Sequence, residues 1–328
     1  MASSSCSLSI LENKNFVAIN DNKEGFGSMR GLAVNGEMVA SSGENGVLTI
    51  SGNGGKSFNG TVRLNPDLDY RDVEVLNDQT IVVMSAGPGA ASTITRVTTV
   101  GNENTVHPAL VNEHEQGFWD GIAFLDGSNY GLLVGDAIDG KLTVMITNDG
   151  AASYRAASNP PQVGDRQYCF AASGTSLALV SQNLALIATG GEESQVWRST
   201  DGGDNWTAID IPFISGSDGS GVFSIAFKDD AHGVIVGGDY ERPEINENVA
   251  AFTNDGGLTW TASTVMTGGY RSAVDWLDEY GAWFAVGPDG CDWSYDGVEW
   301  FAGPAEFKGH TMVEGWSSFV GSKLLKLQ

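Results

Sequence analysis

Three arginines stand at similar places in the sequence, each just before a short apolar run. They are Arg30, Arg71 and Arg271, in a chain that holds nine arginines altogether. Guanidinium groups that converge on one point bind carboxylate or phosphate through paired hydrogen bonds. The alternative is that each arginine forms a structural ion pair with a nearby acid such as Asp72 or Asp120. The two interpretations are compatible, and the predicted ligand-binding set is Arg30, Arg71, Asp72, Trp119, Asp120, Asp239 and Arg271.

Two further groups of side chains are weaker candidates for catalysis. Glu241 lies beside Tyr240 in the sequence, and Tyr270 follows later, so a tyrosine–glutamate nucleophile pair is conceivable. We favour the simpler interpretation that these residues make a loop rim polar. No phosphate-binding loop, nucleophile elbow or dinucleotide fingerprint is present, so we expect no cofactor.

Asp136 and Asp139 are the only candidates for a metal site that the sequence offers. Two carboxylates three residues apart can approach one cation, but the following Gly140 makes a hairpin turn the better explanation. The four histidines show no metal-ligand spacing. The prediction is therefore that no metal is bound.

Short apolar runs determine the expected fold class. Runs such as residues 80–84, 131–134 and 233–236 are four to five residues long and are bounded by Gly, Asn, Asp or Ser. This pattern is typical of β-strands, and no segment sustains a helical period. The sequence predicts an all-β protein.

One eight-residue pattern repeats along the chain. Residues 199–206 recur as residues 253–260, with weaker copies at 51–58 and 147–154 and a shorter one at 294–300. The steps between copies are 96, 52, 54 and 41 residues. The first step corresponds to two units, with a degenerate copy near residues 97–101, and a unit of about 40 to 54 residues is the length of one four-stranded propeller blade. The structural residues of these turns are Asn53, Asp149, Asp201, Trp206, Asp255, Trp260 and Asp296.

This repeated pattern resembles the Asp box of sialidase-like (BNR-type) propellers, S/T-x-D-x-G-x-x-W. In such a turn the acid accepts backbone N–H bonds, the glycine adopts a positive φ, and the aromatic ring packs between blades. The pattern is therefore informative about fold and says little about chemistry.

Seven starts of inner strands predict a seven-bladed β-propeller of four-stranded antiparallel blades with Asp-box turns. The last unit is short, so a strand within residues 8–19 is expected to complete it and close the ring. One domain would then span residues 1–328. Successive strands turn at alternating ends, which places the inner-strand starts and the arginines on the face opposite the Asp-box turns.

The chain also resembles one lineage of bacterial propellers related to the plant photosystem II stability/assembly factor, some of them loosely labelled oxidoreductases. The similarity is carried by residues 28–32, 70–74, 118–124, 135–140, 170–175, 237–240, 269–272 and 285–288. It implies a seven-bladed ring that binds a partner polypeptide through an arginine-rich face. Arg30, Arg71 and Arg271 are the residues that match such a role.

Composition excludes several classes of function. The chain of 328 residues carries a net charge of −24, so it lacks the cations needed to bind nucleic acid. No apolar run is long enough to cross a membrane, and three cysteines exclude a disulfide framework. Because relatives are usually exported, an extracytoplasmic location is favoured if a targeting segment has been removed.

The leading interpretation is a non-catalytic, monomeric binding or assembly module. It would take an anionic group, or a partner polypeptide, at the channel mouth. The first alternative is an exo-acting glycan hydrolase of sialidase type. The second is a metal-dependent lyase or oxidoreductase that uses Asp136 and Asp139.

Overall fold

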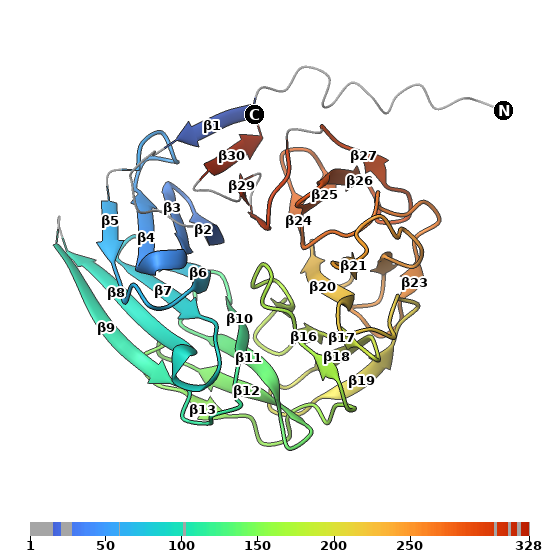
Figure 1. The fold of residues 1–328 in the computed structure, drawn as a ribbon, viewed down its shortest axis with the longest axis horizontal. Helices are drawn as coiled ribbons and strands as arrows, with labels where there is room; N and C mark the ends of the chain where they lie inside the picture. The colour runs from blue at the N-terminus through green and yellow to red at the C-terminus, as the bar shows by residue number, and fades with distance from the viewer. Residues whose placement is uncertain are drawn as a thin grey trace.

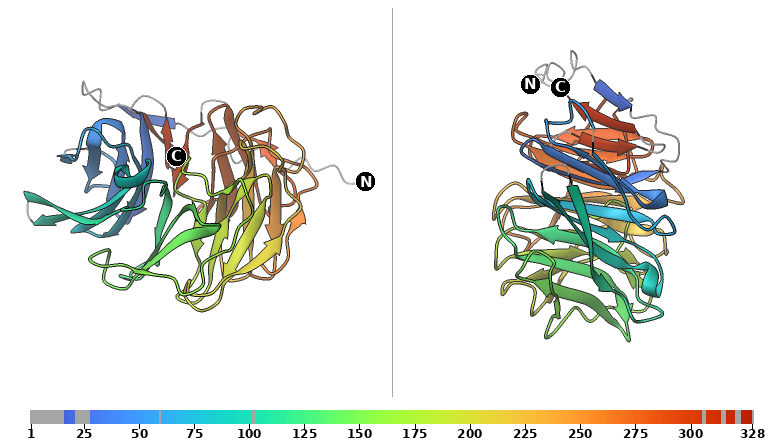
Figure 2. Two further views of the ribbon diagram at one scale, coloured as in Figure 1. Left: turned by 60° about the horizontal axis from the view of Figure 1, so that its bottom comes forward. Right: turned by 90° about the vertical axis from the view of Figure 1, so that its left-hand side faces the viewer.

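A computed structural model describes residues 16–20, 28–58, 60–100, 103–304, 307–313, 316–319 and 323–327. Strands arranged as a ring account for the architecture (Figure 1). Each sheet runs from an inner strand near the ring axis to an outer strand at the perimeter, and neighbouring sheets pack face to face (Figure 2). Short 3-10 turns, η1 (Glu44–Gly46) and η2 (Gly89–Ala91), follow β3 and β7. In the described part of the chain no helix is long and apolar enough to span a membrane.

The first three sheets follow the chain without interruption, each written here from its inner to its outer strand. They are β2 (Met29–Asn35), β3 (Met38–Gly43), β4 (Val47–Ser51) and β5 (Gly60–Arg63); β6 (Tyr70–Asn77), β7 (Thr80–Ser85), β8 (Thr93–Val100) and β9 (Glu103–Val111); and β10 (Trp119–Phe124), β11 (Gly131–Ile138), β12 (Lys141–Thr147) and β13 (Arg155–Ala156).

In the next third of the chain, the strands of two neighbouring sheets alternate along the sequence. One contains β15 (Leu177–Leu179), β16 (Ala185–Ala188), β18 (Gln195–Ser199) and β19 (Thr207–Asp210). The other contains β14 (Gln167–Tyr168), β17 (Gly190–Gly191), β20 (Ser220–Phe227), β21 (Gly233–Asp239), β22 (Ala250–Thr253) and β23 (Thr261–Ala262).

The remaining strands complete the ring. One sheet contains β24 (Ala273–Leu277), β25 (Ala282–Gly287), β26 (Gly290–Ser294) and β27 (Phe301–Ala302). The other contains β28 (Thr311–Val313), β29 (Trp316–Phe319), β30 (Lys323–Leu327) and, at its outer edge, β1 (Phe16–Asn20).

The predicted ring of seven equivalent four-stranded blades is wrong. Over the described residues six blades are four-stranded, and the remaining sheet has six strands because β14 and β17 join it beside β20. The junction is the pairing of Gly190 with Gly221, where a Cβ on Gly190 would lie 2.6 Å from the Gly221 Cα. Two glycines permit this close approach of backbones, and nothing in the strand pattern predicts it.

Antiparallel pairing of β1 with β30 joins the two ends of the chain, with Phe16 opposite Leu327 and Asn20 opposite Lys323. An N-terminal strand was expected in this sheet, and residues 8–15 of that expected segment lie outside the described residues. Such pairing covers the edge of the last sheet and closes the hydrogen-bonded ring. The one-domain organisation over residues 1–328 stays a prediction.

The acidic turns have the geometry that the repeat predicts. In the third of them Asp201 accepts the Asn205 N–H at 3.0 Å, and the Ser199 hydroxyl bonds both Asp201 and the Gly203 N–H. Gly202 and Gly203 have φ of 74° and 82°. The same pattern of contacts recurs at Asp149 and Asp255, and in altered form at Asn53 and Asp296.

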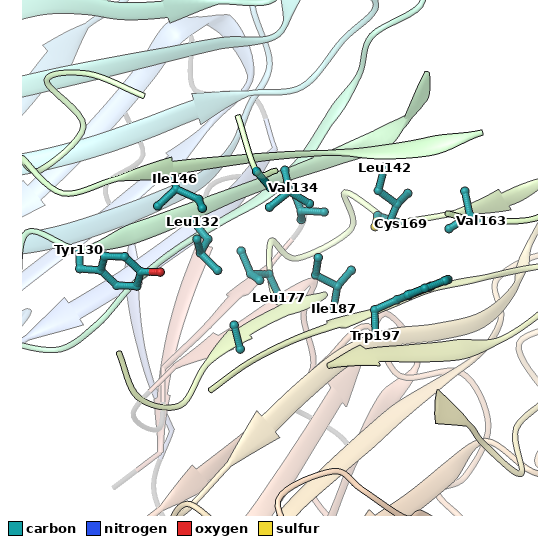
Figure 3. Close-up of a cluster of buried hydrophobic side chains, with 13 residues drawn as sticks. Tyr130, Leu132, Val134, Leu142, Ile146, Val163, Cys169, Leu177, Ile187 and Trp197 are labelled. Carbon is teal, nitrogen blue, oxygen red and sulfur yellow. The ribbon is translucent and has the colours of Figure 1, made fainter. Parts of the chain in front are cut away.

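Apolar side chains fill the space between neighbouring sheets. Figure 3 shows one such layer, in which Leu132 and Val134 from β11 face Ile187 from β16 and Trp197 from β18. Trp260, the aromatic residue of a repeated turn, packs in another such layer, where its ring centroid lies 6.2 Å from that of Phe227. This packing is consistent with the role predicted for that aromatic position, which stays a prediction. Trp206 is a partly buried neighbour of the layer in Figure 3.

We predict that Asp201→Ala lowers the free energy of unfolding by about 1–3 kcal/mol at pH 7, because turn N–H groups lose their acceptor. Burial raises the pKa of Asp201, but hydrogen bonds from Asn205 and Ser199 outweigh it and leave the pKa below its usual value. The contribution is thus present above about pH 4 and fades as the pH falls through the folded-state pKa. Urea unfolding at pH 7 and at low pH measures both effects. Asp289→Ala, at an exposed turn, is the control, and an equal loss in both variants would contradict the role of Asp201.

Candidate functional site

Irregularities at the starts of the inner strands create the candidate site. In β2, β6, β10 and β20 the pairing register slips by one residue, which leaves an extra residue opposite the neighbouring strand. Such a β-bulge bends the strand and re-aims the extra side chain. The extra residues occupy equivalent positions at one end of the ring and are Arg30, Arg71, Asp120 and Phe223.

Arg30 and Arg71 come from neighbouring inner strands, β2 and β6, and both are half-buried. Arg71 is 28% exposed and donates from Nε to Asp69 at 2.7 Å. Among the described residues its two terminal nitrogens make no further hydrogen bond. Arg30 and Arg71 thus occupy equivalent positions on adjacent inner strands, and their convergence on one ligand stays a prediction.

Arg271 does not belong to this pair. Its Nη2 lies 2.6 Å from Asp292, and both side chains are nearly inaccessible, at 7% and 5% exposure. Ala273 pairs with Val286 just as Asp72 pairs with Met84, so Ser272, not Arg271, is equivalent to Arg71. The similarity between residues 70–72 and 270–272 suggested a register that is wrong by one residue. In a strand, such a slip turns the side chain to the other face.

His310 is the site residue that the sequence did not identify. The Gly309 N–H donates to the Gly287 carbonyl, and the Arg271 N–H donates to the Gly237 carbonyl. Gly309 and Arg271 therefore occupy equivalent positions, so the residues that follow them, His310 and Ser272, are equivalent as well. His310 therefore lies between Ser272 and Arg30 in the ring, and the Ser272 hydroxyl donates to its carbonyl at 2.7 Å. The signal available in the sequence was the predicted inner-strand start at residues 309–312, whose histidine matched no motif.

Acidic residues continue the mouth beyond Arg71. Asp120 is 1% exposed, and burial, aided by the charge of Asp136, holds the pKa of Asp120 well above its usual value although Arg71 opposes this. Burial also raises the pKa of Asp136 to about 6. Asp120 Oδ2 and Asp136 Oδ1 have no hydrogen-bond partner among the described residues. Two buried carboxyls with raised pKa values and no other hydrogen-bond partner favour an arrangement in which they share one proton.

Asp136 and Asp139, the weak candidates for a metal site, do not share a common position in the structure. Asp139 is exposed in a tight turn, with φ of 52° followed by 76° at Gly140, whereas Asp136 is directed toward Asp120. No cluster of three or more metal-ligating side chains exists in the described part of the chain. Cys169 and Cys291 are both buried, and Cys6 lies outside the described residues.

Aromatic side chains form the side of the mouth opposite Arg71. Phe223 stacks on Phe170 with ring centroids 4.0 Å apart, and its edge contacts Tyr270 and Tyr240. Asp239, 1% exposed, holds the following loop through Arg242 and the Glu241 N–H. Neither Tyr240 nor Tyr270 is hydrogen-bonded to Glu241 among the described residues, so the nucleophile pair is not formed. Trp119 is buried behind the mouth among apolar side chains.

A loop crosses the ring axis directly below the mouth. Residues 170–175 precede β15 and replace the inner-strand start that was predicted at Cys169 and Phe170. Ser173 donates to the Ser272 carbonyl on one side, while Thr175 bonds Ser224 on another. Gly174, with φ of 75°, lies so close to the Asp72 carboxyl that a Cβ there would be 2.3 Å from its Cγ. The loop therefore contacts residues of inner strands, or of their starts, from three different sheets.

Beyond this loop a cavity of about 750 Å³ opens toward the ends of the inner strands, on the half that carries the acidic turns. Its described carboxylates come from Asp72, Glu74, Asp126, Asp275, Asp278 and Glu279, and Lys228 is the one cation among its described lining residues. Lys228 itself lies over the Trp276 ring at 4.8 Å. The two ends of the channel thus differ in charge.

Asp72 belongs to the wall of this lower cavity and not to the arginine pair. Its carboxylate accepts the Ile122 N–H from the next inner strand at 2.8 Å and the Val73 N–H at 2.8 Å. Burial raises the pKa of Asp72 to about 7, although these bonds oppose the shift. Burial also holds the pKa of Glu74 well above its usual value, and the charges of Asp72 and Asp126 add to this.

Comparison with known proteins agrees with the fold. No protein-family model and no curated protein matches the chain. Among solved structures, YCF48 from Cyanidioschyzon merolae superposes with a TM-score of 0.63 at 14% identity, covering 95% of this chain and 98% of that one. A structure titled YCF48 bound to D1 peptide gives a TM-score of 0.42 at 13% identity, over 90% and 74% of the two chains. The first similarity supports the β-propeller fold of this chain.

We expect Arg271→Ala to lower the free energy of unfolding by about 3–5 kcal/mol, because it leaves Asp292 buried without its partner. Thermal or urea unfolding measures the loss. Arg155→Ala removes an exposed pair with Asp204 and should cost about 1 kcal/mol or less. Equal stability of the two variants would show that the Arg271 pair is not structural.

The raised pKa of Asp72 predicts a dependence of stability on pH. The folded state holds this proton up to about pH 7, whereas the unfolded chain releases it near pH 4, so stability falls as the pH rises between these values. Asp72→Asn cannot ionise, and its free energy of unfolding should fall less over the same range. Urea unfolding at several pH values gives the slopes, and parallel slopes for the two proteins would refute the assignment.

Proposed function

We propose that this protein is a non-catalytic binding module that takes an anionic group of a partner polypeptide at the mouth formed by Arg30 and Arg71. The observation that supports the proposal is the pair of β-bulges that release Arg30 and Arg71 from the ladder at equivalent positions of adjacent inner strands. A terminal or side-chain carboxylate is the simplest group that two guanidiniums recognise. Phe223, Tyr240 and Tyr270 supply apolar surface beside it for a neighbouring side chain.

The electrostatic setting supports the choice of an anion. A chain of net charge −24 repels anions at long range, so a site for one needs local cations. The loop at residues 170–175 closes the channel below the mouth, so a ligand at the mouth is held at the surface. A polypeptide end or loop fits such a shallow site. Two further predictions remain: that the protein is a monomer and that its location is extracytoplasmic.

The catalytic alternatives lack a corresponding arrangement of groups. A sialidase-type mechanism needs a tyrosine–glutamate pair, and Tyr240, Tyr270 and Glu241 do not make one. The metal-dependent alternative relied on Asp136 and Asp139, of which the second points into solvent in a hairpin turn. We therefore propose binding in preference to either reaction.

Arg71→Ala should weaken binding of a carboxylate by about ten- to a hundred-fold, the effect of one lost charge-assisted hydrogen bond. The probe is a short peptide with a free C-terminal carboxylate, compared with the same peptide as its C-terminal amide by calorimetric titration. Arg155→Ala, remote from the mouth, is the control and should bind as the unaltered protein does. Equal affinity for acid and amide, or no loss in Arg71→Ala, would refute the proposal.

A further inference from the structure

His310 stands next to the arginine pair in the ring. Among the inner-strand starts, the bulge-equivalent positions on three consecutive strands are occupied by His310, Arg30 and Arg71, which precede or lie in β28, β2 and β6. The strands β28 and β2 are in contact, as are β2 and β6. An imidazole at the end of a row of two guanidiniums, all at equivalent positions, makes an arc of three side chains with nitrogen donors.

We propose that His310 is the third arm of an oxyanion-binding site with Arg30 and Arg71, and that anion binding there takes up a proton. The proposal rests on the proposed function and adds two elements to it. It replaces Arg271 by His310 in the binding set, and it makes affinity depend on pH. The ligand class becomes an oxyanion that accepts hydrogen bonds from three sides, such as a carboxylate, sulfate or phosphate group.

The surroundings of His310 explain why a bound anion is needed to charge it. Burial lowers the pKa of His310 below 6.5, and the charges of Arg30 and Arg71 lower it further. The strands that pack against β28 are β2, β24, β25 and β29; Arg30 lies in β2, and Asp275 lies in the half of β24 that lines the lower cavity. Lys308 on the same segment is a further cation. Asp120 and Asp136 lie beyond Arg71.

The direction of the linkage follows from these charges. An anion on Arg30 and Arg71 offsets the repulsion that keeps His310 neutral, so the pKa of His310 is higher in the complex than in the free protein. Affinity therefore rises as the pH falls from the pKa of the complex to that of the free protein, by at most about tenfold per pH unit for one proton. Outside this interval the contribution of His310 is constant.

Sulfate is the probe, since its charge does not change between pH 5 and 8. In the full chain, the His310 imidazole is followed by NMR with ¹³C-labelled histidine, and its signal is assigned by comparison with His310→Gln. We expect its pKa to rise when sulfate saturates the site, and calorimetry in buffers of different ionisation enthalpy to show proton uptake. An unchanged or lowered pKa of His310 would overturn the inference.

Two substitutions separate charge from shape at this position. His310→Gln is permanently neutral, so sulfate affinity should lose its dependence on pH and remain near the value of the unaltered protein at pH 8. His310→Lys is permanently charged and should bind sulfate several-fold more tightly at pH 8, again without the dependence. The control is His232→Gln, because His232 is exposed and pairs with Asp229. Unchanged pH profiles in both His310 variants would refute the role.

Acidic groups near Arg71 titrate in the same range and need their own control. Asp136→Asn removes the carboxyl whose pKa is about 6 and should leave the dependence on pH in place. If the dependence disappears in Asp136→Asn and persists in His310→Gln, the proton belongs to the acid pair and the inference fails. If Arg71→Ala abolishes sulfate binding but the affinity of the unaltered protein does not depend on pH, the inference fails while the proposed function stands. Binding unaffected by Arg71→Ala would refute the proposed function as well.

Discussion

Apart from β20, which β17 joins at Gly221, each inner strand in the described part of this ring has one edge with no strand beside it, and its backbone groups there need hydrogen-bond partners. Side chains of the adjacent sheet provide many of them. Asp72 accepts the Ile122 N–H, Ser224 accepts the Val274 N–H, and Ser42 donates to the Tyr70 carbonyl. Because buried polar backbone groups left unpaired are costly, these contacts fix how each sheet is set against the next. The channel wall is therefore built from polar residues whose first role is structural.

The same constraint explains why the two ends of the channel differ. Where the inner strands begin, β-bulges release one residue per strand from the ladder and aim it at the mouth, as at Arg30, Arg71 and Phe223. Farther along, the regular ladder resumes, and acids such as Asp72 and Glu74 serve the edge of the neighbouring strand. The loop through Ser173 and Gly174 separates the cationic arc at one end from the carboxylate-lined cavity at the other.

Several features followed from local sequence because they depend on neighbouring residues. Alternating apolar runs predicted strands, and the repeated pattern ending in Trp206 and Trp260 predicted turns in which an acid accepts backbone N–H groups. The alternation of strand direction predicted that the arginines lie on the face opposite these turns. In the structure, backbone hydrogen bonds such as that from the Gly202 N–H to the Asn183 carbonyl place the turns beside the ends of the inner strands. These inferences succeed because a tight turn or a strand is specified within about ten residues.

By itself the sequence determined an all-β ring, its repeated turns and two members of the candidate site, Arg30 and Arg71. Tertiary structure decided the rest. The six-stranded sheet depends on a contact of Gly190 with Gly221, and the loop across the channel depends on partners far along the chain, such as Ser173 and Ser272. The one-residue slip that buries Arg271 and brings His310 to the mouth depends on which residue opposes Val286 and Gly287. Pairing between distant strands sets that register, and a side chain changes faces with each single step, so no local pattern determines it.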